Sequence, residues 1–454
     1  MKIKKTTNLL VLRSLIFLGL VLALAVPQRL IAQSNVSTNS VKIAMIEGMS
    51  GAFANAGEAV ARNLRFAVEQ VNARGGVRLK GGAVPLELLI LDGKGQIEES
   101  LLMLKAASDK GAVAVLQGNS SSVAAGLIEG IEKHNQRVLA AAQMLYLNYS
   151  AVDPALTNEK CSPWHFRFDA HIDMRMVALV AALAQDKTIK RVYLLNQDYV
   201  FGQQVAASAR RAISATRPDI QIVGDELHPV GRIKDFAPYA SKIKAVNADA
   251  VLTGNWGNDL ALFVKSAKEV GLNAQFFTFY GNALGTPATL GEQGVGKVIA
   301  VSEWHSNARF VANGKSAKLS SATQAYDDWY GAYKKRFPDG KDDYFNPRNV
   351  LMIEMWVAAL EQASHNNKEA TLGRSAAQTA RYLEGARATQ VGLQAVMRAE
   401  DHQLIQPLWV YRMEKRGAMG VINDVENSGF GFQTVLQMPA KQLALPHTCM
   451  LKSQ

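Results

Sequence analysis

GAVAVLQGNSSS, residues 111–122, is the stretch of sequence that decides the fold. Its apolar, valine-containing run from Ala112 to Leu116 is typical of a strand that is buried on both faces of a parallel sheet. The run is broken at Gly118, and three serines then precede the periodic apolar segment 123–131. The serines therefore lie where a helix begins, with hydroxyls and free N–H groups that could hold an anion such as a carboxylate. The alternative is one ordinary N-cap and two solvated serines.

The N-terminus has the pattern of a secretory signal peptide, which we assign to residues 1–32. Lys2, Lys4 and Lys5 form a basic head, and the apolar run Leu15–Val26 is followed by small residues. The alternative, a membrane anchor, is disfavoured because the uninterrupted run is too short to span a bilayer well. We therefore expect the protein to be exported by a cleavable signal peptide.

Length and composition are sufficient for two cores of ordinary domain size. The chain has 454 residues, 48% of them hydrophobic, and a formal net charge of +11 at pH 7. Part of that charge is lost when the signal peptide is cleaved. The remaining basic residues are dispersed and are not interspersed with aromatic residues, so we expect no nucleic-acid partner. The two cysteines, Cys161 and Cys449, could form a disulfide in an oxidising compartment, and two unpaired thiols are the alternative.

Strands and helices alternate along the chain, which is the mark of doubly wound parallel sheets. In the first half we predict strands at Val41–Ile46, Leu86–Leu91, Ala112–Leu116 and Val138–Ala142. After Asp169 the pattern restarts, and we predict strands at Arg191–Leu195, Ile220–Leu227, Ala250–Thr253, Phe276–Tyr280, Lys297–Ser302 and Leu408–Met413. The fold class is therefore α/β, with two doubly wound lobes.

Ligands of open parallel sheets collect beyond the carboxyl ends of the strands. These ends are rich in Asn, Gln, Ser, Trp and Tyr, and they fall at Glu47–Ser50, Asn119–Ser122, Ala141–Met144, Asn196–Tyr199, Asn255–Asn258 and Tyr280–Asn282. Such a lining suits a small organic solute held by hydrogen bonds and by the rings of Tyr199, Trp256 and Tyr280. For each ring taken alone, packing in a core is the alternative.

Catalytic and metal-binding patterns are weak. The segment GEQGVGKV, residues 291–298, nearly matches a phosphate-binding loop, but Val298 stands where the Mg²⁺-binding Ser or Thr belongs. A nucleophile elbow of the Gly-x-Ser-x-Gly type is absent from the sequence. His165 and His171 make a poor metal site without nearby cysteines or repeated carboxylates. We expect no enzyme activity, no catalytic or metal-binding residues and no cofactor; a hydrolase that uses Ser121 or Ser122 is the opposing hypothesis.

The opening of the mature chain, VKIAMIEGMSGAFANAGEAVARNLRFAVEQVNARGGV at residues 41–77, resembles type I periplasmic binding proteins of the branched-chain amino acid group. The likeness continues through GNSSS at 118–122, RVYLLNQDYVFGQ at 191–203, DFAPYASKIKAVNADAVLTGNWGNDL at 235–260 and AKEVGL at 267–272. It covers about residues 41 to 435, and the ordered set of motifs is more specific than any one of them.

The resemblance implies two lobes that are joined by three crossovers and close on a ligand. Lobe 1 would comprise residues 41–167 and about 297–402, and lobe 2 residues 168–296 and about 403–454. It also implies a periplasmic monomer that delivers an amino acid or related small carboxylate to an inner-membrane ABC permease. A ligand-binding sensor of the same fold is an alternative function.

The family's ligand contacts fall on identifiable positions of this sequence. The carboxylate would be held by Ser120, Ser121 and Ser122 and by the backbone from Ala141 to Gln143, with Tyr199, Trp256 and Tyr280 completing the lining. The acid that pairs with the ammonium of amino acids falls near Tyr280, which is a departure from the family. An α-amino acid would then need Asp198 or Glu47 as the charge partner, and a neutral or aromatic carboxylate would fit about as well.

Overall fold

The computed structural model describes residues 40–308, 321–366, 375–388 and 395–451. The signal peptide that we predict at residues 1–32 lies outside these described residues. Within them, none of the helices combines the length and the apolar character that crossing a bilayer requires.

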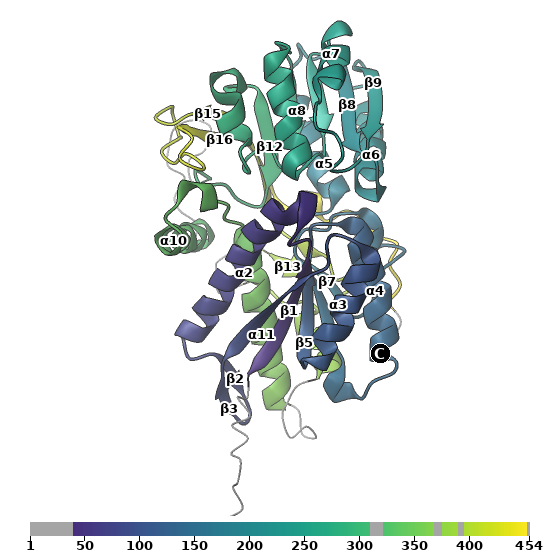
Figure 1. The fold of residues 1–454 in the computed structure, drawn as a ribbon, viewed down its shortest axis with the longest axis vertical. Coiled ribbons are helices and arrows are strands. Elements are labelled where there is room, and N and C mark those ends of the chain that lie inside the picture. Colours follow the sequence, from purple (N-terminus) through teal and green to yellow (C-terminus); the bar gives the residue numbers. More distant parts are fainter. Residues whose placement is uncertain (1–39, 309–320, 367–374, 389–394, 452–454) are drawn as a thin grey trace, which may run out of the picture. The chain divides into compact units, whose positions relative to one another are not determined.

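The first lobe is built on a sheet of five parallel strands in the order β4-β1-β5-β6-β7. Its strands are β1 (Val41–Glu47), β4 (Leu86–Asp92), β5 (Ala112–Gln117), β6 (Leu145–Asn148) and β7 (His165–Arg167). Its main helices are α2 (Ala54–Ala73), α3 (Ile97–Asp109), α4 (Ser121–Asn135) and α11 (Pro347–Asn366), with α2 and α11 side by side in Figure 1.

Both faces of this sheet are covered, as the apolar sequence of its strands predicts. Along β1, Ile43 and Met45 belong to the core under α2, whereas Ala44 and Ile46 belong to the core under α3 and α4. Successive side chains of a strand point to opposite faces, so a run of four apolar residues such as Ile43–Ile46 needs helices on both sides of the sheet.

The second lobe is built on a sheet of seven strands in the order β16-β15-β12-β11-β10-β8-β9. Five strands are parallel: β8 (Arg191–Gln197), β9 (Gln221–His228), β10 (Ala250–Thr253), β11 (Gln275–Thr278) and β12 (Val298–Ser302). The antiparallel strands β15 (Leu408–Lys415) and β16 (Phe430–Met438) complete the edge. The main helices are α5 (Ile172–Leu183), α6 (Val200–Thr216), α7 (Ala237–Ala245) and α8 (Gly257–Glu269).

Smaller elements join these two lobes or lie at their edges. They include β2 (Val77–Leu79), β3 (Gly82–Val84), β13 (Val396–Met397), β14 (Leu404–Ile405), α9 (Thr286–Leu290), α10 (Ser321–Arg336), α12 (Ala376–Leu383) and α13 (Ala440–Leu443). The chain passes from one lobe to the other after β7, after β12 and after β14, which makes the three expected crossovers. The GEQGVGKV segment leads directly into β12 rather than into a helix, unlike a phosphate-binding loop.

Two expected boundaries are wrong. The strand Val298–Ser302 pairs with β11 and β15 of the second lobe, so that lobe extends past residue 297, where we expected the first lobe to resume. The fourth strand is Leu145–Asn148 rather than Val138–Ala142, and Ala140–Ala142 forms an exposed 3₁₀ turn. Leu145 and Leu147 fill one core while Tyr146 fills the other, which the small alanine side chains could not do.

The Cys161–Cys449 disulfide is confirmed. Cys161 lies in the loop between β6 and β7 of the first lobe, and Cys449 lies in the tail that follows β16 of the second lobe. Near the bridge, the Thr448 N–H donates a hydrogen bond of 2.8 Å to Asn158 Oδ1. The tail is therefore fastened to the first lobe.

Candidate functional site

Strand ends from both lobes border an inner cavity of about 40 Å³. Its lining is made of hydroxyl, amide, aromatic and aliphatic side chains, among them Ala56, Asn119, Ser121, Ser150, Tyr199, Phe201, Trp256, Leu260, Tyr280, Ala283 and Tyr344. None of the described residues that line this cavity is charged. Such a surface can take the apolar or aromatic part of a small solute and offers hydrogen bonds for its polar end.

The three serines of the decisive stretch face different surroundings. Ser120 is the N-cap of α4, and its Oγ accepts a hydrogen bond of 3.4 Å from the Val123 N–H. Ser121 lines the inner cavity, and its Oγ accepts a hydrogen bond of 3.3 Å from the Asp153 N–H. The hydroxyl proton of Ser121 is therefore left to donate to another acceptor. Ser120 and Ser122 instead line an adjoining outer cavity of about 550 Å³.

The side-chain amide of Asn119 has an unmet hydrogen-bonding requirement among the described residues. Its Nδ2 is buried and has no hydrogen-bond partner among the described residues, although Asn119 borders both cavities. A buried donor without an acceptor costs about 1–3 kcal/mol, which an incoming acceptor would relieve. We placed Asn119 at a strand end but not among the ligand contacts; its position before the N-cap of α4 was the available signal.

The carboxylate of Glu47 accepts hydrogen bonds from the backbone N–H groups next to this site. Its Oε1 accepts hydrogen bonds of 2.7 Å from the Gly118 N–H and 2.8 Å from the Asn119 N–H, and a further one from the Tyr149 hydroxyl. Burial raises the pKa of Glu47 above its usual value, against the opposing effect of these hydrogen bonds. Glu47 and the exposed Asp198 border the outer cavity rather than the inner one.

Tyr199 and Trp256 border both cavities. The Trp256 indole N–H donates a hydrogen bond of 3.0 Å to the Tyr199 hydroxyl. The Trp256 ring stacks on Phe53 of the first lobe, with ring centroids 5.2 Å apart. These side chains close one end of the inner cavity, so Trp256 has a contact within the protein where we expected one with the ligand.

Tyr280 lines the inner cavity, as the strand-end prediction expected. Burial raises the pKa of its phenol to about 12, so the group is neutral at physiological pH. The guanidinium carbon of Arg175 lies 5.6 Å from the centroid of the Tyr280 ring, within the range of a cation–π contact.

The expectation for Ala141 and Gln143 is wrong, because β6 begins after them and its carboxyl end lies elsewhere. Both residues line a separate small cavity with Trp356 and Leu360. The Gln143 side chain donates a hydrogen bond of 3.1 Å to the Asn135 carbonyl. Ser150, just beyond β6, lines the inner cavity instead.

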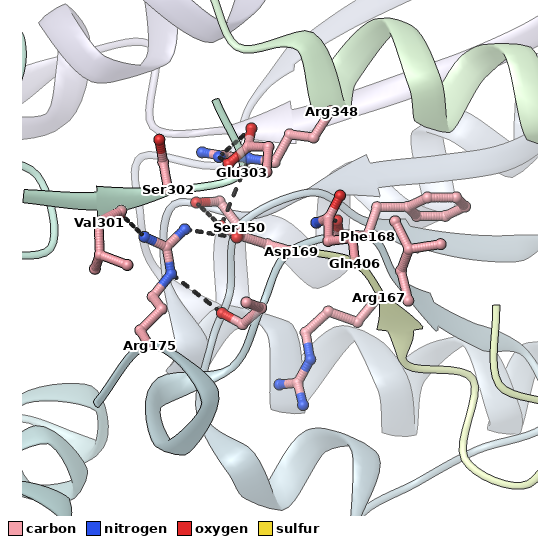
Figure 2. Close-up of polar contacts among 12 residues, drawn as sticks. Ser150, Arg167, Phe168, Asp169, Arg175, Val301, Ser302, Glu303, Arg348 and Gln406 are labelled. Carbon is pink, nitrogen blue, oxygen red and sulfur yellow. Dashed lines mark hydrogen bonds and ion pairs between the residues drawn. The ribbon is translucent and has the colours of Figure 1, made fainter. Parts of the chain in front are cut away.

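A buried cluster of two acids and two arginines lies at the crossovers (Figure 2). Arg175 Nη2 lies 2.5 Å from Asp169 Oδ1, and Arg348 Nη1 lies 2.8 Å from both oxygens of Glu303. Each of these four side chains is at most 5% exposed. The charges balance, which buried ions require because each one has lost its hydration. Sequence patterns gave no indication of this cluster.

Comparisons with known proteins agree with the geometry. The family model described as periplasmic binding protein matches residues 40–418. A protein named Leu/Ile/Val-binding protein homolog 4, from Brucella abortus (strain 2308), is 30% identical over 385 residues, which cover 84% of this chain and 85% of the relative. Homolog 7 from the same strain is 22% identical over 335 residues, covering 71% of this chain and 77% of the relative.

Solved structures have the same fold. The closed conformation of the leucine-, isoleucine-, valine-, threonine- and alanine-binding protein from Brucella ovis has a TM-score of 0.75 and 27% identity, and covers 91% of this chain and 100% of that one. A solute-binding protein from Rhodopseudomonas palustris BisB5, in complex with 3,4-dihydroxybenzoic acid, has a TM-score of 0.70 and 16% identity, and covers 88% of this chain and 98% of that one. At that identity the second likeness concerns the fold alone.

Proposed function

Because this chain belongs to the periplasmic binding proteins, in the branched-chain amino acid group of type I, we propose that it is an exported receptor for a small carboxylate. The carboxylate binds between the two lobes, and the loaded receptor delivers it to an inner-membrane ABC permease. Neither catalysis nor a cofactor is part of this function, and the receptor acts as a monomer.

The observation that supports this proposal is the Nδ2 of Asn119, which has no hydrogen-bond partner among the described residues and lines the same cavity as the Ser121 hydroxyl. Both groups lie at the N-terminus of α4, where the helix dipole favours negative charge. Two uncommitted donors at a positive helix end suit a carboxylate, and hydrogen bonds to a charged group are worth about 1.5–3 kcal/mol each.

The rest of the cavity suits an uncharged remainder of the solute. Rings of Tyr199, Phe201, Tyr280 and Tyr344 and the side chain of Leu260 can pack against a branched aliphatic or an aromatic group. Leucine, isoleucine and valine appear in the names of the curated relatives, and 3,4-dihydroxybenzoic acid in that of a more distant structure. An α-ammonium group would have to be held by hydroxyl and carbonyl oxygens, since the described lining has no acid.

A hydrolase that uses Ser121 as nucleophile has little support. A serine nucleophile needs an adjacent base, and the described lining of the inner cavity contains no histidine, lysine or acid. The Ser121 oxygen is also occupied as an acceptor for a backbone N–H.

Thermal unfolding in the presence of matched pairs of solutes tests the carboxylate claim. The chain without its leader is screened with leucine against leucinamide, and with benzoate against benzamide. A ligand at a hundred times its Kd stabilises the folded state by about 2.7 kcal/mol, which gives a visible shift. We expect at least one acid to raise the unfolding temperature and its amide to leave it unchanged. An equal shift with acid and amide would contradict the proposal.

A further inference from the structure

The carboxylate of Asp169 contacts groups of both lobes (Figure 2), with a shorter distance to the second lobe than to the first. Asp169 lies in the first crossover, and its Oδ1 is 2.5 Å from Arg175 Nη2 of the second lobe. Arg175 is fixed in that lobe by a hydrogen bond of 2.7 Å to the Val301 carbonyl of β12. Oδ2 faces two groups of the first lobe, Ser150 Oγ at 3.3 Å and Arg348 Nε at 3.5 Å.

The Arg348 Nε is a buried donor with an unmade hydrogen bond. It has no hydrogen-bond partner among the described residues, while Nη1 of the same guanidinium is satisfied by Glu303. Native structures rarely leave a buried donor of a charged group unsatisfied, because its desolvation is then uncompensated. The 3.5 Å gap to Asp169 Oδ2 therefore calls for an explanation.

The gap occurs in a structure whose lobes touch. At the mouth of the cavity Phe53 stacks on Trp256, and Asn55 Nδ2 donates a hydrogen bond of 3.1 Å to Asn258 Oδ1. Phe53 and Asn55 come from the first lobe, and their partners come from the second. The loose Arg348–Asp169 link thus belongs to the closed arrangement.

We propose that Asp169 is a positioning residue whose Oδ2 passes between two partners as the lobes move. When the lobes part, Arg348 Nε closes on Oδ2. When they meet, Oδ2 accepts a hydrogen bond from the Ser150 hydroxyl, and this bond fixes the orientation of the hydroxyl in the ligand cavity. The buried carboxylate is partnered in both arrangements, so the hinge has two preferred states rather than a continuum.

This exchange couples the lobe angle to the cavity. Ser150 lines the inner cavity, and its donation to Asp169 Oδ2 leaves its oxygen lone pairs to accept a hydrogen bond from a solute while the lobes are closed. A solute that contacts Ser150 therefore favours closure through differential contacts. The proposal goes beyond the receptor function, because the exchange is a property of the hinge itself.

Small-angle scattering of the leaderless chain without added solute tests the exchange. Arg348→Lys keeps the positive charge opposite Glu303 but lacks Nε, so we expect a smaller radius of gyration than in the wild type. Adding Ser150→Ala removes the partner that holds Oδ2 in the closed arrangement, so the double variant should return toward the wild-type radius. Adding Ser150→Thr instead should keep the compact form.

Arg336→Lys is the matched control, because Arg336 is an exposed arginine of the first lobe that pairs with Glu69 on the surface. It should leave the scattering curve unchanged. An Arg348→Lys curve that equals the control, or a compaction that Ser150→Ala does not reverse, would overturn the proposal.

Circular dichroism shows whether each variant folds. If Arg348→Lys does not fold, Ser150→Ala alone must give a more open curve and Ser150→Thr must restore the wild-type curve; coincidence of Ser150→Ala with the wild type overturns the exchange. A second arm adds leucine or benzoate. If neither leucine nor benzoate binds the wild type, the proposed receptor function is contradicted. The scattering curves recorded without solute still test whether Asp169 Oδ2 changes partner.

Discussion

Phe53 and Trp256 stack with their ring centroids 5.2 Å apart, although they come from different lobes. Phe53 ends the turn before α2, and Trp256 is the N-cap residue of α8. Their contact closes the mouth of the inner cavity, and the Trp256–Tyr199 hydrogen bond fixes the indole in that position. The ring pair is a contact that exists only when the lobes meet.

Replacing Phe53 by alanine should therefore speed the release of a bound solute. An aromatic pair is worth about 0.5–1.5 kcal/mol beyond its buried area, which corresponds to a roughly two- to tenfold faster dissociation. Stopped-flow tryptophan fluorescence with a hit from the thermal screen measures this rate. Phe53→Tyr keeps the ring and should behave as the wild type; equal rates for Phe53→Ala and the wild type would show that the pair does not hold the lobes together.

Ser121→Ala should weaken carboxylate binding while Ser120→Ala should not. Loss of a hydrogen bond to a charged group costs about 1.5–3 kcal/mol, so we expect a roughly ten- to hundredfold rise in Kd for Ser121→Ala. Ser120→Ala removes the N-cap of α4 and should lower the free energy of unfolding by about 1 kcal/mol with little effect on Kd. Calorimetric titration and urea unfolding separate the two effects, and a reversed pattern would move the carboxylate to the outer cavity.

His305 should make the folded state sensitive to acid. Its Nδ1 accepts from the Asn307 N–H and its Nε2 lies 2.9 Å from Thr434 Oγ1, so the ring is enclosed as a neutral imidazole. Burial lowers its pKa to about 3, below the usual 6.5. The unfolded chain therefore binds this proton first, and the stability that the neutral ring provides is lost as the pH falls from 6.5 toward 3.

Between pH 7 and pH 5 this one group should remove about 2 kcal/mol from the free energy of unfolding. Urea unfolding of the wild type and of His305→Gln at both pH values isolates the contribution of His305. Burial also lowers the pKa of His165 and His171, but both proteins contain these residues, so their effect cancels in the difference. The difference in free energy of unfolding between the wild type and the variant should decrease by about 2 kcal/mol when the pH falls from 7 to 5. An unchanged difference would mean that the ring is already protonated in the folded state.

Removing the disulfide should destabilise the protein by about 2–5 kcal/mol, since the bridge joins residues 288 positions apart. Guanidinium unfolding of a Cys161→Ser, Cys449→Ser double variant measures the loss. The wild type unfolded in the presence of a reductant should match the variant. A variant as stable as the oxidised wild type would mean that the tail contributes nothing to the folded state.

The local features of the first lobe were predictable from sequence. The strand at Ala112 and the serine N-cap of α4 follow from short-range patterns that need no knowledge of distant residues. The fourth strand was placed too early, because VLAAA and LYL are both apolar and only the second can fill two cores at once. The choice between them is made by the opposing helices, which a local pattern does not contain.

The candidate site was predictable in part for the same reason. The strand-end rule placed Ser121, Tyr199, Trp256 and Tyr280 around one cavity. It missed Ser150, whose place depended on the strand that was shifted. The buried cluster of Asp169, Arg175, Glu303 and Arg348 could not be predicted, because its members come from different crossovers and from α11. Isolated charged residues without a local sequence pattern are normally predicted to be exposed to solvent.

The Cys161–Cys449 bridge gives the two lobes a fourth connection beside the three crossovers. A hinge of chain segments alone leaves each lobe free to sample many orientations, and every binding event must discard that freedom. The covalent strap removes part of it before a solute arrives, so the loss of orientational entropy on closure is smaller. We therefore expect the C-terminal tail to preorganise the lobes for closure, and reduction of the bridge to weaken ligand capture.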